Sequence, residues 1–436
     1  MSLRLKLISF FLCIGVIPLT LIGGYSVHVA SESLREQAFS QLTSLRTAKK
    51  EGLLGLFERW RLETEMYAAT KEVYNAAGML RDYALDTPEN ERMDVTSGEY
   101  IELYDYLAGA FTPFVEKLGF LDALLIGDRG RIFFTYQRNK DLGENVLKGP
   151  LLKNSTLRQV FARSMQGKTA FVDFAPYPGL NGQPAAFMAA PVYDHVGEVD
   201  SVAVLMLPLD AINALMTGRE GMGETGETYL VGPEGLMRSD SFKDAKHRSV
   251  LAAFAAPERA RVETQSLRKG LGGETGVAVG QDFLGRETLT AWTPVRFDTT
   301  VWVLLAEMDA SEAFAPVERL RQASLGLGVV VAVLVCLIAW IFIRVELLKP
   351  LHSIREFAEY VAGGILSAKA EGRFSPELRG LRDAIMLMVE SLKDKLQEVK
   401  RNADWAETSR REVQKAQTLM EQVDAYQQEE IDRLAE

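Results

Sequence analysis

Two stretches of this chain carry no charged residue over the length of a membrane span, and they constrain the fold more than any other feature. The first covers 7–28 and the second covers 322–343. Each reaches the roughly 20 apolar residues that a helix needs to cross a hydrocarbon core. Only a helix satisfies its own backbone hydrogen bonds there, so we expect both stretches to be transmembrane helices.

Positive residues next to these stretches predict the side of the membrane for each end of the chain. Arg4 and Lys6 precede the first stretch, and Arg344 and Lys349 follow the second. The positive-inside rule therefore places residues 1–6 and the C-terminal part in the cytoplasm. A cleaved signal peptide is the alternative for the first stretch, but the length of its apolar run favours an uncleaved anchor. We expect a multi-pass protein of the cell (inner) membrane whose central segment is extracytoplasmic.

Composition excludes several function classes. The chain has 436 residues and a net charge of −10, which argues against a nucleic-acid partner because DNA binding needs a clustered basic face. Cys13 and Cys336 lie inside the apolar stretches and are interpreted as small hydrophobic residues. The sequence contains no metal-ligand cluster and no catalytic constellation, so we expect neither a cofactor nor an enzyme.

The segment between the two apolar stretches is predicted to be α+β. Residues 29–82 contain no proline and have apolar residues at near-heptad spacing, which predicts a long stalk helix. Beyond Gly119 the period changes to strands joined by turns, beginning with a hairpin around Asp128-Arg129-Gly130. A hairpin, a helix and three further strands then recur. This repetition predicts two tandem antiparallel-sheet modules, at 83–218 and 219–309.

The run GETGETYLVGPEGLMRSDSF, with LIGDRGRIFFTY before it and WVLLAEMD after it, resembles the double-Cache sensors of bacterial transmembrane receptors. These sensors contain a membrane-distal and a membrane-proximal PAS-like module behind one long helix. The resemblance implies a small-molecule ligand in the distal module, which here is 83–218.

The resemblance also implies ligand-binding residues. Tyr177, in the loop PYPGLNGQ, and Asp194, at the end of the next strand, match positions that contact ligand in amino-acid-sensing relatives. Asp173 and Tyr136 are added on pattern alone; for each of the four, an ordinary turn or edge-strand role is the alternative. The Arg-x-Trp-Tyr stretch of those relatives is replaced by RSMQGK, and Gly179 stands where an acidic contact is expected. We therefore do not predict an amino-acid ligand.

The segment after the second apolar stretch resembles a HAMP domain, which relays signals as a parallel four-helix bundle formed by two chains. Pro350 matches the proline that opens the first HAMP helix, and Glu377 follows Pro376 at the start of the second. The resemblance implies a HAMP domain at 344–398, with Pro350 and Glu377 in the signal relay. Apolar residues at alternating spacings of three and four then predict a coiled coil at 399–436 and a homodimer.

These features together predict a chemotaxis-receptor type of transmembrane signal transducer. The coiled coil is expected to continue beyond Glu436 into an output domain that contacts cytoplasmic signalling proteins. Two alternatives remain open at this point: the sensor half of a histidine kinase or nucleotide cyclase, and a ligand-free membrane-anchored coiled-coil scaffold.

Overall fold

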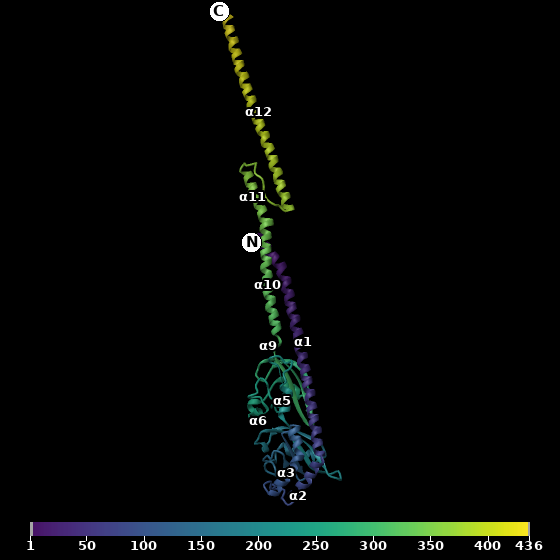
Figure 1. Cartoon of the computed structure of the whole chain (residues 1–436). Coiled ribbons are helices and arrows are strands. Elements are labelled where there is room, and N and C mark those ends of the chain that lie inside the picture. Colours follow the sequence, from purple (N-terminus) through teal and green to yellow (C-terminus); the bar gives the residue numbers. More distant parts are fainter. Residues whose placement is uncertain (1–2, 435–436) are drawn as a thin grey trace. The chain divides into compact units, whose positions relative to one another are not determined.

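The computed structural model describes residues 3–434, which fold into two compact units. One unit comprises Val27–Arg321, and the other contains the chain on either side of it. Two helical segments, Lys6–Ala69 and Ala315–Ala362, are long and apolar enough to cross a membrane. The larger unit contains both antiparallel sheets (Figure 1). The predicted fold class, α+β with helical segments on either side, is confirmed.

Helix α1 (Leu3–Ala69) joins the first apolar stretch to the stalk without a break. The prediction that this helix continues to residue 82 is wrong. Thr70 leaves the helical conformation, and its hydroxyl accepts a hydrogen bond from the backbone N–H of Val73, which starts α2 (Lys71–Ala84). A threonine oxygen at this position satisfies one of the free N–H groups of a new helix, which favours a break over continuation.

The first module has a five-stranded sheet in the order β2-β1-β5-β4-β3, in which every neighbouring pair is antiparallel. The predicted hairpin forms at Gly130, whose φ of +81° suits a turn. The elements of the module after α2 are α3 (Gly98–Thr112), η1 (Pro113–Lys117), β1 (Asp122–Gly127), β2 (Ile132–Thr135), α4 (Thr156–Ser164), β3 (Ala170–Pro176), η2 (Pro178–Leu180), β4 (Pro184–Tyr193), β5 (Val199–Met206) and α5 (Leu209–Thr217).

The second module has a four-stranded antiparallel sheet in the order β6-β9-β8-β7. The sequence predicted another strand after β6, but Met237 forms only an isolated bridge to Val231. The elements of this module are β6 (Glu227–Val231), α6 (Val250–Ala255), α7 (Pro257–Ala260), α8 (Gln265–Leu271), β7 (Gly276–Gln281), β8 (Glu287–Phe297), β9 (Thr300–Asp309) and α9 (Ala310–Ala313).

Both sheets bury one face against α1. Leu53 and Trp60 of α1 belong to the core that covers one face of the first sheet, and Ala38 and Leu42 pack on the second sheet. The opposite face of the first sheet is covered by α4 and the loop before it, and that of the second sheet by α6 to α8. Most strands are therefore buried on two sides, which explains runs such as Asp122–Gly127 that are buried at every position. The edge strand β7 is the exception, since its residues alternate between half-buried and exposed.

An aromatic cluster fills the junction between the two modules. The Phe57 ring of α1 stacks on Phe297 of β8, with centroids 3.8 Å apart, and meets Trp302 of β9 edge-on at 5.5 Å. Phe171 of β3 contacts the same three rings. Because α1 and both sheets contribute to one apolar cluster, the modules share a core rather than a flexible linker.

The other unit is helical. It contains the start of α1 together with α10 (Ala315–Phe342) from Gln322 onward, η3 (Ile343–Leu348), α11 (Lys349–Ala362) and α12 (Pro376–Leu434). Gly15 of α1 lies against Val335 of α10, and a Cβ at Gly15 would come within 3.2 Å of the valine side chain. A small residue at such a contact lets two apolar helices approach closely.

The two predicted relay residues lie at helix starts. Pro350 is in the first turn of α11 and Glu377 in the first turn of α12. Helices α11 and α12 pack against each other, with Ile354, Phe357 and Val389 buried. The HAMP relay itself stays a prediction.

Candidate functional site

Tyr177 is fully buried in the first module. It precedes η2, its ring packs edge-on against Phe187 of β4 with centroids 4.9 Å apart, and its hydroxyl donates to Oδ2 of Asp141. Asp141 has no exposed surface either, and its Oδ1 has no partner. Burial raises the pKa of the Asp141 carboxyl, while the hydrogen bond from Tyr177 opposes that shift. Gly179 is required beside this pair, because a Cβ there would lie 2.4 Å from the Tyr177 ring.

Asp122 is a second buried carboxyl in the same module. Its Oδ1 accepts from the backbone N–H of Ala123 at 2.8 Å and of Gln137 at 3.1 Å, and its Oδ2 accepts from Asn139 at 2.9 Å. Burial raises its pKa to about 7, and the charge of Asp141 adds to the shift. No sequence pattern singles out Asp122 or Asp141, since Asp122 is the first residue of a strand and Asp141 lies in irregular chain between β2 and α4.

Asp194 does not lie near Tyr177, contrary to the prediction that both contact one ligand. The two residues flank opposite ends of β4, whose ten residues span roughly 30 Å at the usual rise of a strand. The Asp194 Oδ1 accepts from the N–H groups of Val196 and Glu198, both at 2.9 Å, and so closes the turn between β4 and β5. Slight burial raises its pKa, but these backbone hydrogen bonds dominate and the net shift is downward.

Asp173 lies at the junction of the two modules instead of in a ligand pocket. Its Oδ1 accepts from Arg238 Nε at 2.7 Å, and its Oδ2 accepts from Arg238 Nη2 at 2.9 Å and Trp302 Nε1 at 3.0 Å. The Arg238 side chain is only 2% exposed and also contacts Glu234. Asp173 of β3 in the first module is thus held by two residues of the second module, Arg238 and Trp302.

Tyr136, the fourth predicted residue, lies just after β2. Its hydroxyl donates to Glu116 Oε1 at 2.7 Å, and its backbone carbonyl accepts from the Tyr104 hydroxyl at 2.8 Å. These contacts tie the end of β2 to η1 and α3. The structure therefore places the four predicted ligand residues at separate positions, and only Tyr177 belongs to a buried polar pair within the first module.

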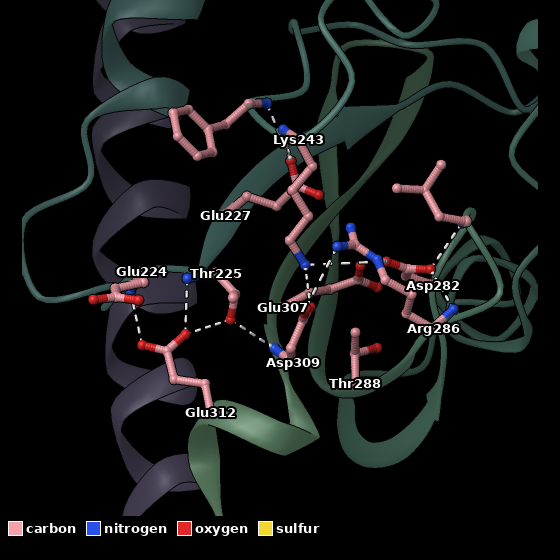
Figure 2. A network of polar contacts seen from close by, with 12 residues as sticks. Glu224, Thr225, Glu227, Lys243, Asp282, Arg286, Thr288, Glu307, Asp309 and Glu312 are labelled. Carbon is pink, nitrogen blue, oxygen red and sulfur yellow. Dashed lines mark hydrogen bonds and ion pairs between the residues drawn. The ribbon is translucent and has the colours of Figure 1, made fainter. Parts of the chain in front are cut away.

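The second module contains a larger polar network, shown in Figure 2. Lys243 lies at its centre, with Nζ 2.7 Å from Asp309 Oδ1 and 4.0 Å from Asp282 Oδ2. Arg286 approaches the same two carboxylates, at 3.3 Å from Asp282 and 3.5 Å from Asp309. No sequence motif marks this network, because its members come from a loop, a turn and a strand end.

Glu312 of α9 clamps the loop that opens the second module. Its carboxylate accepts from the N–H groups of Glu224 and Thr225, both at 2.7 Å, and from the Thr225 hydroxyl (Figure 2). The Thr225 hydroxyl oxygen in turn accepts from the N–H of Asp309 at 3.1 Å. The Thr225 side chain therefore connects the segment before β6 both to the end of β9 and to Glu312 of α9, shortly before α10 begins.

A cavity of about 670 Å³ opens in the second module between the α7–α8 region and β7. Its volume lies in the range of small-molecule sites. Arg261 and Lys269 line it together with Glu258 and Glu263, and Lys269 Nζ lies 5.6 Å from the centre of the Trp292 ring. Among the described residues, no group of three or more metal-ligating side chains comes together.

No protein-family model matches the chain, and no curated protein does. Among solved structures, it is similar to the ligand-binding domain of the Pseudomonas fluorescens chemoreceptor CtaA in complex with L-leucine, at 13% identity and a TM-score of 0.40, over 65% of this chain and 99% of that one. It is also similar to the sensor domain of the V. cholerae histidine kinase DctB, at 12% identity and a TM-score of 0.42, over 62% and 97%.

A third similar structure is the periplasmic sensory domain of the Campylobacter jejuni chemoreceptor Tlp1, at 14% identity and a TM-score of 0.42, over 65% of this chain and 99% of that one. All three are ligand-binding or sensor domains of signalling proteins. Their ligands are properties of those proteins, so the function of this chain is argued from its own geometry.

Proposed function

We propose that the chain is a transmembrane receptor whose two-module sensor binds a small molecule outside the cell membrane and passes a conformational signal to its cytoplasmic helices. The observation that carries this proposal is the continuity of the chain at both ends of the sensor. Helix α1 contains an apolar stretch of membrane length and packs on both sheets, and β9 leads through α9 directly into the apolar helix α10. A conformational change in a sensor that is joined to a membrane helix at each end can pass directly to those helices.

The apolar surface of α12 supports the dimeric relay in this proposal. Leu392, Leu396 and Val399 are between 45% and 63% exposed in the single chain. Their spacing of four and three is that of a coiled-coil seam, and a second copy of the chain would bury them. The proposed homodimer signals through an output domain to cytoplasmic proteins, in the manner of a chemoreceptor. A histidine kinase or cyclase output is the rival, and it uses the same sensor.

The proposed ligand site is the distal module beside the Tyr177–Asp141 pair. A buried carboxyl with one unpartnered oxygen and a phenol next to a short loop form a polar site inside an otherwise apolar core. Such a site favours a small ligand that can donate a hydrogen bond. Asp194 and Asp173 are left out of this site, because the turn and the module junction already account for their hydrogen bonds.

The test uses the full chain in nanodiscs. Ligands that raise the unfolding temperature are first selected from a small-molecule screen. Each is then tested for its effect on disulfide formation between single cysteines at Leu392, in a background without Cys13 and Cys336. A true ligand should change both readouts at the same concentration, because binding to one conformation shifts the population of that conformation.

Two matched variants locate the site. Tyr177→Phe and Asp141→Asn should weaken binding roughly 10-fold or more, since each removes a buried hydrogen-bonding group. Lys269→Met, at the cavity of the second module, should leave binding unchanged. Loss of binding in Lys269→Met alone would place the ligand in the second module. Stabilising ligands that never alter crosslinking would contradict the receptor function and favour a membrane-anchored scaffold.

A further inference from the structure

The polar network of the second module carries more negative than positive charge. Glu227, Asp282, Glu307 and Asp309 are each at most 9% exposed. Lys243 is the only buried cation among the residues that make this network, because the Arg286 side chain is 44% exposed. Four carboxylates against these two cations would leave two negative charges uncompensated if all were ionised. Unpaired buried charge is costly, so the folded module favours binding of a positive species.

Polar atoms without a partner mark where that species binds. Glu227 Oε1 and Glu307 Oε2 are buried and have no hydrogen-bond partner, and the Tyr229 hydroxyl faces Glu307. Glu227 and Glu307 are direct partners across the β6–β9 ladder, and Tyr229 follows Glu227 by two residues on the same face of β6. Like charges opposite each other in a sheet repel. A proton on one of the two carboxyls removes this repulsion and supplies an O–H donor where acceptors are unpaired.

We propose that the Glu227–Glu307 pair is a proton-binding site, and that the second module thereby responds to the pH outside the membrane. This site is separate from the ligand site proposed in the first module and does not depend on it. No group of metal-ligating residues was found in the described part of the chain, which favours a proton over a metal ion as the bound cation.

Several elements supply polar or charged groups around Glu307. Strand β6 supplies Glu227 and Tyr229, and β8 supplies Thr290, whose hydroxyl lies 3.2 Å from Glu307 Oε1. The charged groups that complete the surroundings are Lys243 from the loop after β6, Asp282 and Arg286 from the β7–β8 turn, and Asp309 from β9 itself. Burial is the main cause that raises the pKa of Glu307, to about 8, with the charge of Glu227 next; Lys243 opposes the shift.

The sign of the pH effect follows from this shift. In the unfolded chain Glu307 loses its proton near its ordinary pKa of 4.5, whereas in the folded module it keeps the proton up to about pH 8. Between these values the folded state binds more protons than the unfolded state, so stability falls as the pH rises through this window. Above about pH 8 both states are ionised and the dependence levels off.

The position of the site connects it to the membrane helix. Glu307 lies two residues before Asp309, whose N–H binds Thr225 and whose side chain binds Lys243. Glu312, which clamps Thr225, comes three residues later and precedes α10. Ionisation of Glu307 therefore loosens the strand that leads into α10, at the point where it is tied to the start of β6.

Hydrogen–deuterium exchange of the full chain in nanodiscs, between pH 6 and 9, tests the proposal. Protection factors of β6 and β9, corrected for intrinsic exchange rates, should fall in the natural chain relative to Glu307→Gln by up to about tenfold per pH unit below pH 8. The glutamine keeps the shape of a protonated glutamate and should remove the dependence. Glu287→Gln, at the exposed start of β8 in the same sheet, is the matched control and should keep it.

A second variant keeps the test valid if Glu307→Gln folds poorly. Tyr229→Phe removes a hydroxyl that favours the ionised carboxylate, so its transition should move to higher pH. An unchanged pH profile in Glu307→Gln, or an unchanged midpoint in Tyr229→Phe, would overturn the assignment. Restoration of protection at pH 9 by millimolar Ca²⁺ or Mg²⁺ would also overturn it, because the site would then bind a metal cation.

Discussion

At the scale of single residues, Asp173 was predicted from its sequence position to bind ligand, but it connects the two modules. Its carboxylate holds Arg238 and Trp302 of the other module. Asp173→Asn should destabilise the sensor by about 2–3 kcal/mol, less than the roughly 3–5 kcal/mol for a fully broken buried pair, since Glu234 still contacts Arg238. The measurement is the unfolding temperature of the full chain in nanodiscs.

Asp105→Asn is the matched control for this prediction. Asp105 pairs with Arg138 at 3.0 Å, but their side chains are 68% and 48% exposed. An exposed pair contributes about 0–1 kcal/mol, so this change should be nearly neutral. Equal losses of stability in the two variants would mean that the Asp173 contacts at the module junction stabilise the sensor no more than an exposed ion pair does.

Only part of the candidate site is predictable from the sequence, for a physical reason. The resemblance to double-Cache sensors points to Tyr177, but its partner Asp141 lies 36 residues earlier in irregular chain. The contact between Asp173 and Arg238 joins residues 65 apart in different modules. Periodicity reports which face of an element is buried, and it carries no information on which distant side chain meets it there.

At the scale of the elements, strands with continuous apolar runs were predicted well, and the failures have local causes. The β1–β2 hairpin forms as expected, and β8 and β9 form at the segments predicted to be strands. The strand expected after β6 does not form, because the Ser239 hydroxyl accepts from the N–H of Leu230 at 3.0 Å, where a strand would offer a backbone carbonyl. The pattern of apolar residues does not reveal that a side chain takes the place of a backbone carbonyl in this hydrogen bond.

Helix α12 provides a prediction at this scale. Single cysteines along it, in a background without Cys13 and Cys336, should crosslink most strongly at the seam positions. These are Leu392, Leu396, Val399, Ala403 and Ala406. Crosslinking should drop several-fold at Lys393 and Lys400, which lie off the seam. The driving force is burial of large apolar side chains at roughly 1.5–3 kcal/mol each.

The single chain already shows that these positions are exposed, so a profile without a maximum at the seam cannot be attributed to inaccessible cysteines. Such a flat profile in membranes would contradict the parallel coiled coil. It would leave α12 as a solvated helix without a partner.

At the scale of the whole molecule, the two apolar helices predict the topology of the chain. A membrane-impermeant maleimide applied to intact cells should label a cysteine at Glu258, which is exposed in the sensor, and should not label one at Lys400 of α12. Both should be labelled after the membrane is permeabilised. The opposite pattern, or labelling of both in intact cells, would exclude the proposed orientation.

The packing of α1 has a consequence for what kind of stimulus the chain can report. The part of α1 from Ala38 onward packs on both sheets, whereas α10 continues from the second sheet alone. A displacement shared by both modules carries the two helices together and leaves no net movement between them. Only a change in one module relative to the other separates them. Under the proposed function, the sensor therefore transmits conformational changes in which one module moves relative to the other. It does not transmit movements that both modules share.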